Sequence, residues 1–262
     1  MTTAVAGISF MMRVRNEEQT LEKSVRSLFS LTIPYEIVLV LHLCTDRSRE
    51  IAERLRREND RICIFEYSVE TSRAGYETLA TDAKSPHSLM TYYNWCLNKT
   101  KMPWVFKWDG DFIASEGLVR FLNAGSWEQR ATGGRYEIDA RNSDNSNKEL
   151  YLICMLATYA KHMFWETPIY LHIPGDTPLT CPDDAYIVHE SEISDIKQHW
   201  TRVPWYTAED SDEARLVQDR MHRLESDFGK EPLAHVRCGN YELDKNQSTI
   251  AHFNPSYVSV DS

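Results

Sequence analysis

The alternation of apolar and amphipathic segments in the first half of the chain constrains the fold more than any other feature. Short apolar runs occupy residues 7–14, 36–43, 61–67 and 104–108. Amphipathic segments separate them at residues 16–30, 45–59 and 88–100. Strands and helices that alternate in this way build a parallel sheet wound with helices. The sequence therefore predicts an α/β fold whose mostly parallel sheet binds ligands beyond the carboxyl ends of its strands.

The first amphipathic segment carries two helix signals. Leu21, Val25 and Leu28 recur at the spacing of one helical face. Asn16 and Gln19 have the spacing of a capping box, in which each side chain bonds the other residue's backbone N–H. These signals predict a helix that begins close to Asn16.

The second half of the chain has a more irregular pattern. Residues 131–140 and 149–160 are predicted strands on either side of a polar loop at 141–149. We expect a single domain over 1–262, with a nucleotide-binding half at 1–113 and an acceptor-binding half at 114–262. The two halves are not expected to fold separately.

Composition narrows the class of protein. The 262 residues can bury a full core, and the net charge of -10 argues against nucleic acid as the main partner. An anionic substrate would need a metal or a local group of basic residues. The six cysteines form no Cys-x-x-Cys pair, so neither a zinc site nor a disulfide framework is indicated. No stretch reaches the roughly 20 apolar residues of a membrane span, and we expect a soluble, cytoplasmic protein.

Two Asp-x-Asp triplets compete as the functional site. Asp109 and Asp111 follow a predicted buried strand, where two carboxylates on the same side of an extended chain can reach one hard cation. Asp210 and Asp212 precede a long charged helix, where complementation of the helix dipole explains them. The position after a strand favours the first triplet. Gly110, which stands between these two aspartates, has no side chain and would let a ligand approach closely.

Three ordered features resemble the GT-A glycosyltransferases, especially those of family 2. They are a strand followed by "RVRNEEQTLEKSVRSL", a strand followed by "HLCTDRSREIAERL", and a helix containing "YYN" before a strand that ends in "DGD". This resemblance covers roughly residues 7–125. It implies a GT-A fold and transfer of a sugar, with inversion, from a UDP- or GDP-linked donor to a saccharide, glycoconjugate or other hydroxyl acceptor.

The same resemblance implies roles for individual residues. Asp111 would ligate Mn²⁺ or Mg²⁺ at the donor diphosphate, and Asp109 would contact ribose or sugar. Asn16 and Glu17 match the family's pattern in the donor site. His42 lies near the position of the usual base-reading carboxylate, so the identity of the base stays open.

The basic side chains at the ends of the first two predicted strands have two interpretations each. Arg13 and Arg15 would stack on the base or pair with phosphate, or they form a solvated basic pair. His42 would contact the base, or it is a hydrogen-bonded histidine at a strand end. The resemblance also implies that a late histidine approaches the metal or the phosphates. His189 is the choice, with His252 as a rival and Lys197 as a weaker phosphate ligand.

An inverting transfer also needs a carboxylate that activates the acceptor hydroxyl, and this residue must come from the second half. The candidates are Glu166, Asp183, Asp184 and Glu190. Asp184 is the first choice because it lies between a turn rich in Gly and Pro and an apolar run, and Glu166 is the second.

Two other functions remain open. A nucleotidyltransferase that makes nucleotide sugars would use the same sheet and aspartates, but "RVRNEEQ" lacks its usual Gly-rich, basic phosphate loop. A non-catalytic sugar- or nucleotide-binding module would have only surface charge at the late carboxylates. Hydrolysis of the donor in the presence of metal and without acceptor would separate this module from an enzyme.

Overall fold

The computed structural model describes residues 7–73, 76–125, 127, 135–138, 140–142, 148–149, 155–156, 164–165, 171–172, 179–190 and 203–229. The chain divides into two compact units. The first contains Met1–Ser68, Trp95–Phe164 and His172–Ser191, and the second contains Val69–Asn94, Trp165–Leu171 and Glu192–Ser262.

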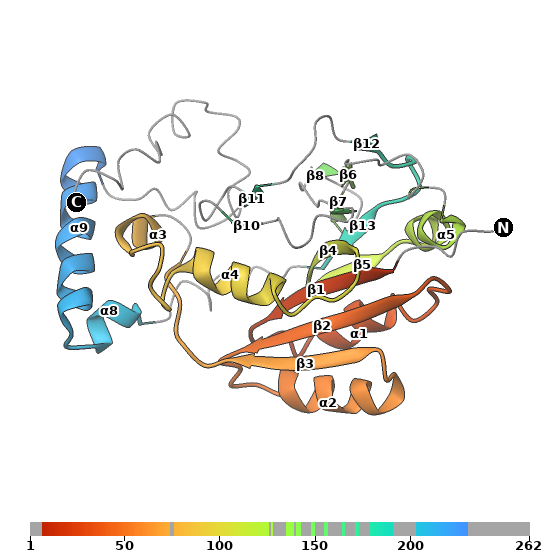
Figure 1. Ribbon diagram of the computed structural model, residues 1–262, viewed down its shortest axis with the longest axis horizontal. Helices are drawn as coiled ribbons and strands as arrows, with labels where there is room; N and C mark the ends of the chain where they lie inside the picture. Colours follow the sequence, from red (N-terminus) through yellow and green to blue (C-terminus); the bar gives the residue numbers. More distant parts are fainter. Residues whose placement is uncertain are drawn as a thin grey trace. The chain divides into compact units, whose positions relative to one another are not determined.

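A parallel arrangement of four strands in the order β3-β2-β1-β4 forms the centre of the first unit (Figure 1). The strands are β1 Ile8–Val14, β2 Tyr35–His42, β3 Ile62–Tyr67 and β4 Trp104–Asp109. Every residue of β2 is buried, as is usual for a parallel strand that is covered on both faces. The predicted α/β fold with a mostly parallel sheet is confirmed.

Shorter strands extend this sheet beyond β4. β9 pairs antiparallel with both β4 and β6, and β12 pairs parallel with β6. A second sheet has the order β5-β13-β7-β8, and a third contains β10 and β11. Their bounds are β5 Phe112–Ala114, β6 Arg135–Glu137, β7 Ala140–Asn142, β8 Lys148–Glu149, β9 Met155–Leu156, β10 Phe164–Trp165, β11 Leu171–His172, β12 Leu179–Thr180 and β13 Ile187–His189.

The polar segment predicted as a loop at 141–149 begins and ends in paired strands. Arg141 of β7 is the register partner of Lys148 of β8, and Ala140 is the partner of Glu149. The polar composition of this segment concealed the pairing, because strands were predicted from runs of apolar residues.

Among the described residues of the first unit, three helices lie wholly within it. They are α1 Leu21–Arg26, α2 Ser48–Glu58 and α5 Glu116–Ala124. The predicted capping box is wrong, since α1 begins only after Thr20, and Asn16 adopts a left-handed backbone with φ of 56°. Oδ1 of Asn16 accepts a hydrogen bond of 2.8 Å from the backbone N–H of Thr45 instead. A partner 29 positions away in the chain has replaced the local one.

A cluster of aromatic rings fixes the carboxyl end of β4. The ring of Trp108 lies 5.6 Å from that of Phe10 and 6.0 Å from that of Phe112, centroid to centroid, and all three side chains are almost fully buried. The indole Nε1–H of Trp108 donates to Oγ of Ser24 at 3.0 Å and to the carbonyl of Phe112 at 3.2 Å. These contacts hold the turn between β4 and β5 to helix α1.

The described residues of the second unit are mainly helical. This unit contains α3 Tyr76–Ala80, α8 Trp205–Ala208, α9 Asp212–Phe228 and the first residues of α4 Leu89–Leu97. Ser211 caps α9 by accepting a hydrogen bond of 3.1 Å from the N–H of Ala214. Both aspartates of the Asp210-Ser-Asp212 triplet are exposed and pair with Arg215. The predicted position of this triplet at a helix start is confirmed.

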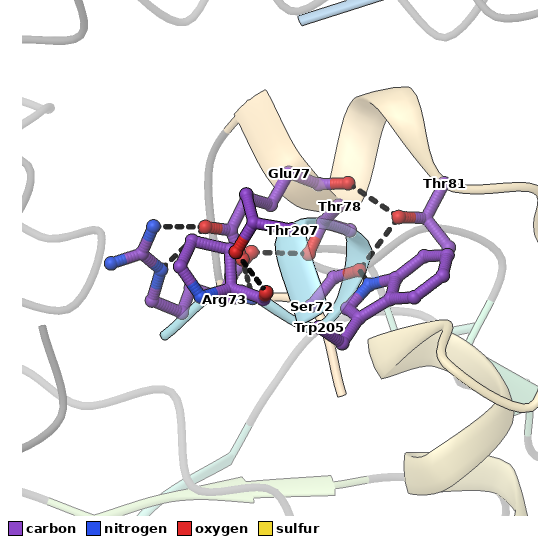
Figure 2. Close-up of polar contacts among 8 residues, drawn as sticks. Ser72, Arg73, Glu77, Thr78, Thr81, Trp205 and Thr207 are labelled. Atoms are coloured by element: carbon purple, nitrogen blue, oxygen red, sulfur yellow. Dashed lines mark hydrogen bonds and ion pairs between the residues drawn. The ribbon is translucent and has the colours of Figure 1, made fainter. Parts of the chain in front are cut away.

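A polar network holds α3 and α8 together within the second unit (Figure 2). Oγ of Ser72 accepts from Nε1 of Trp205 at 3.0 Å and shares a hydrogen bond of 2.6 Å with Oγ1 of Thr81. Beside them, Arg73 pairs with the buried carboxylate of Glu77. The His87 ring stacks on the indole of Trp205, with 3.9 Å between ring centroids. Because each polar group here has a partner, the network serves the packing of this unit.

Candidate functional site

The carboxyl ends of β1 and β4 bring a cation and a carboxylate together. Arg13 and Asp109 are register partners on these neighbouring strands. Nη2 of Arg13 lies 3.1 Å from Oδ1 of Asp109. Since paired residues of adjacent parallel strands project to the same face, the sheet itself sets this contact. The structure therefore brings Arg13, a candidate donor-binding residue, into contact with the first aspartate of the triplet.

A second cation binds the other oxygen of the same carboxylate. Nζ of Lys107 lies 2.8 Å from Oδ2 of Asp109. The side chains of Arg13, Lys107 and Asp109 are 15%, 21% and 29% exposed. Burial raises the pKa of the Asp109 carboxyl, but Lys107 and Arg13 outweigh burial and hold that pKa well below its ordinary value. Asp109 is thus a fixed carboxylate with two neighbouring cations.

The second aspartate of the triplet has a different partner. Nε2 of His189 lies 2.9 Å from Oδ2 of Asp111, and both side chains are mostly buried. The pairing of β13 with β5 creates this contact, because His189 is the register partner of Phe112. The backbone N–H of Glu190 also donates to the carbonyl of Asp111 at 3.0 Å. The late histidine chosen from the sequence is therefore adjacent to the triplet.

Gly110 is required by its own protein neighbour. A Cβ at this position would lie 2.9 Å from Cγ of Glu17, closer than real Cβ contacts. Oε2 of Glu17 in turn accepts a hydrogen bond of 3.1 Å from Oγ1 of Thr20. The glycine thus lets the loop after β1 pack on the triplet, in addition to the approach of a ligand predicted from the sequence.

The loops after β1 and β2 are joined by hydrogen bonds. Besides the contact between Asn16 and Thr45, the N–H of Glu17 donates to Oγ of Ser48 at 2.8 Å. The N–H of Glu18 donates to Oδ2 of Asp46 at 2.9 Å. The residues that carried the resemblance, "RNEE" and "TDRS", therefore shape one continuous edge beside the triplet.

His42 ends β2 as predicted, but its ring is buried. It is 4% exposed and lies edge-on to Tyr67, with 5.9 Å between ring centroids. Tyr67 continues this aromatic row to Trp95, whose ring is 5.2 Å away. Arg15 in the loop after β1 is partly exposed.

Two of the carboxylates considered as the catalytic base, Asp184 and Glu190, lie in different settings. Asp184 precedes β13, at the end of the β5–β13 ladder opposite to Asp111, and its Oδ2 lies 3.0 Å from Nη2 of Arg120. Both side chains of this pair are more than half exposed. Glu190 pairs with Lys23 of α1 at 2.9 Å. Glu166, Lys197 and His252 lie outside the described residues.

Lys107 and Lys23 are the members of this site that the sequence analysis did not select. A signal for Lys107 was present, because it stands two residues before Asp109 on a predicted strand and so projects to the same side. Lys23 carries no comparable signal, since its partner Glu190 is 167 positions away in the chain.

Asp111 and His189 are the residues of this site that could bind a divalent cation. Across the part of the chain that the structure describes, no three or more His, Cys, Asp or Glu side chains are grouped as metal ligands. A site with one carboxylate and one imidazole would take its remaining ligands from substrate phosphates and water, as Mg²⁺ and Mn²⁺ sites commonly do. Within the same described ranges, no helix is both long enough and apolar enough to cross a bilayer.

Known sequences and structures were compared with this chain. No protein-family model and no curated protein sequence matches it. Solved structures of S. aureus TarS are similar in fold. The 1–349 fragment with UDP-GlcNAc has a TM-score of 0.54 and 13% identity, over 91% of this chain and 77% of that one.

Two further TarS structures agree with this result. The 1–349 fragment with UDP has a TM-score of 0.50 and 14% identity, over 87% of this chain and 76% of the fragment. TarS itself has a TM-score of 0.51 and 13% identity, over 86% of this chain. This chain spans 44% of the TarS chain in that structure. At these identities the similarity concerns the fold alone, and it agrees with the expected mixed α/β architecture.

Proposed function

We propose that this chain is a glycosyltransferase that moves a sugar from a nucleotide-sugar donor to a hydroxyl acceptor with the help of Mn²⁺ or Mg²⁺. The observation that carries the proposal is the contact of Asp111 with His189 directly after β4, beside an Asp109 carboxylate fixed by two cations. The site lies at the carboxyl ends of parallel strands, where sheets of this kind bind ligands. The TarS structures with UDP and UDP-GlcNAc support a uridine nucleotide as the first donor to test.

The balance of charge supports a diphosphate ligand together with a divalent cation. The positive charges of Arg13 and Lys107 equal the negative charges of Asp109 and Asp111. A nucleotide sugar brings about two negative charges on its diphosphate, and one divalent cation offsets them. Such a complex adds no net charge to the partly buried site. The diphosphate can therefore bind to an acidic protein without leaving an uncompensated charge.

Each residue of the site has a role in this proposal. Asp111 and His189 would hold the cation, which stabilises the negative charge that develops on the leaving diphosphate. Asp109 would accept hydrogen bonds from ribose or sugar hydroxyls. Arg13 and Arg15 would face phosphate or base. The edge formed by Asn16 and Glu17, with His42 behind it, would border the nucleotide.

Asp184 remains our proposal for the general base, with Glu166 second. Its carboxylate would have to leave Arg120 to accept a proton from the acceptor hydroxyl. That separation costs little, because an ion pair between exposed side chains contributes at most about 1 kcal/mol. Inversion at the anomeric carbon and membership of family 2 belong to the same proposal.

A panel of nucleotide sugars tests the function directly. We expect UDP-GlcNAc or a related donor to raise the melting temperature when Mn²⁺ is present and not when it is chelated. A ligand at 100 times its Kd stabilises the native state by about 2.7 kcal/mol, and this stabilisation raises the melting temperature by a readily measured amount. Slow release of free sugar from the bound donor, without any acceptor, would identify an enzyme. Binding without any release would indicate a binding module instead, and no stabilisation by any donor would refute the proposal.

A further inference from the structure

Lys107 stands on β4 two residues before Asp109, the first aspartate of the triplet, and forms an ion pair with it. The two side chains leave the strand on the same face, and Nζ of Lys107 lies 2.8 Å from Oδ2 of Asp109. Arg13 reaches Oδ1 of the same carboxylate at 3.1 Å. Each oxygen of Asp109 therefore accepts a hydrogen bond from a different cation.

The Lys107 side chain also contacts the support of the second aspartate. Its Nζ lies 5.9 Å from the centroid of the Phe112 ring, within the range of a cation–π contact. The His189 ring stands edge-on to the same phenyl ring, with 5.3 Å between centroids. Phe112 is 1% exposed, so one buried ring contacts both Lys107 and His189.

We propose that Lys107 is a positioning residue that assigns the two aspartates of the triplet to different tasks. Together with Arg13 it holds Asp109 at the strand end, away from the cation and in place for the hydroxyls of the donor. Asp111 and His189 are then the protein's ligands for the cation. This inference rests on the proposed nucleotide-sugar function of the same site.

Electrostatics gives the reason. A carboxylate with two cations in contact is a poor ligand for a third cation, because both cations repel the metal. Each oxygen keeps a further lone pair that can accept a hydrogen bond from a neutral hydroxyl. Without Lys107, one oxygen of Asp109 is released and one positive charge is lost. Asp109 can then turn toward the metal, which gains a ligand, while the donor loses its fixed acceptor.

The test measures two affinities that should move in opposite directions. In Lys107→Met, we expect Mn²⁺ alone to bind on the order of tenfold more tightly, and UDP at saturating Mn²⁺ to bind on the order of tenfold more weakly, by calorimetry. Lys107→Arg keeps the charge and should restore both affinities to within about threefold of the original values. Lys101→Met, which changes an exposed lysine outside the site, should alter neither affinity.

The outcomes separate the two proposals. If the unaltered protein binds Mn²⁺ and UDP but Lys107→Met moves both affinities in the same direction, or moves neither, the positioning role is refuted and the proposed function stands. If the unaltered protein binds neither, the proposed function fails and this inference fails with it. Lys107→Gln keeps a hydrogen-bond donor without the charge, and it gives the same measurement if Lys107→Met does not fold.

Discussion

Nε2 of His189 lies 2.9 Å from Oδ2 of Asp111, although 78 positions separate the two residues in the chain. The antiparallel pairing of β13 with β5 produces this contact. A carboxylate and an imidazole at this distance, both mostly buried, are the two side chains that we propose as ligands of the divalent cation, and neither strand supplies both of them.

Asp111→Asn should abolish metal-dependent binding of a nucleoside diphosphate while the fold persists. The amide keeps the shape of the side chain but removes the charge that a hard cation requires. Calorimetry with UDP and Mn²⁺ measures the loss. Asp212→Asn is the matched control, because this exposed aspartate belongs to the other triplet at the start of α9. Equal behaviour of the two variants would contradict the assignment of the site.

Asp184→Asn should lower turnover by a factor on the order of 10² to 10⁴ and leave donor and metal affinity nearly unchanged. The expected loss is that of a general base, which acts on the acceptor and not on the donor. Steady-state kinetics with a saturating donor, together with UDP binding, separates the two effects. Asp183→Asn is the neighbouring control. Near-normal turnover in Asp184→Asn would direct the search to Glu166→Gln.

His42→Phe distinguishes a base-reading histidine from a packing histidine. Phenylalanine preserves an aromatic ring against Tyr67 but offers no ring nitrogen to a nucleotide base. If His42 reads the base, affinity for UDP should fall about tenfold, the effect of losing one good hydrogen bond. Thermal unfolding without ligand shows whether the variant is folded before the two affinities are compared. Unchanged UDP affinity in a folded variant would leave His42 a structural role only.

Gly110→Ala should destabilise the protein and weaken UDP binding, because its Cβ meets Cγ of Glu17 at 2.9 Å. Overpacking of this kind costs about 1–3 kcal/mol. Glu17→Ala removes the obstructing atoms, so the double variant should recover much of the stability. Urea unfolding of the four proteins in a double-mutant cycle measures this coupling. Strict additivity of the two changes would show that the contact does not decide the residue at position 110.

Cys44 should resist alkylation until unusually high pH in the folded protein. Burial raises the pKa of its thiol, so the folded state favours the neutral form. The same shift makes folding less favourable as pH rises through about 8.5, where the thiol of the unfolded chain ionises. Labelling with iodoacetamide across a pH series, resolved by mass spectrometry, tests this against Cys63, which is partly exposed, as Cys44 is. Half-maximal labelling of Cys44 at or below the ordinary thiol pKa would contradict the prediction.

The sequence was informative where a local pattern decides the structure. Strands β1 to β4 were predicted because a buried parallel strand reads as a continuous apolar run. The placement of the Asp109 triplet at a strand end and of the Asp212 triplet at a helix start followed from the same periodicities. Prediction failed where a distant partner competes with a near one. The Asn16 side chain accepts a hydrogen bond from the N–H of Thr45 and does not cap a helix. Lys23 and Glu190 are far apart in the sequence and form an ion pair only in the folded chain.

The register partnership of Arg13 and Asp109 has a consequence for assembly of the sheet. If β1 shifted by one residue against β4, the Arg13 side chain would emerge on the opposite face, where the core is apolar. An arginine and an aspartate would then lose their mutual contact in poorly solvated surroundings, and removing one partner of such a pair costs about 3–5 kcal/mol when the pair is buried. The ion pair therefore favours the observed alignment of β1 with β4 over a shifted one, because only the observed register avoids that cost.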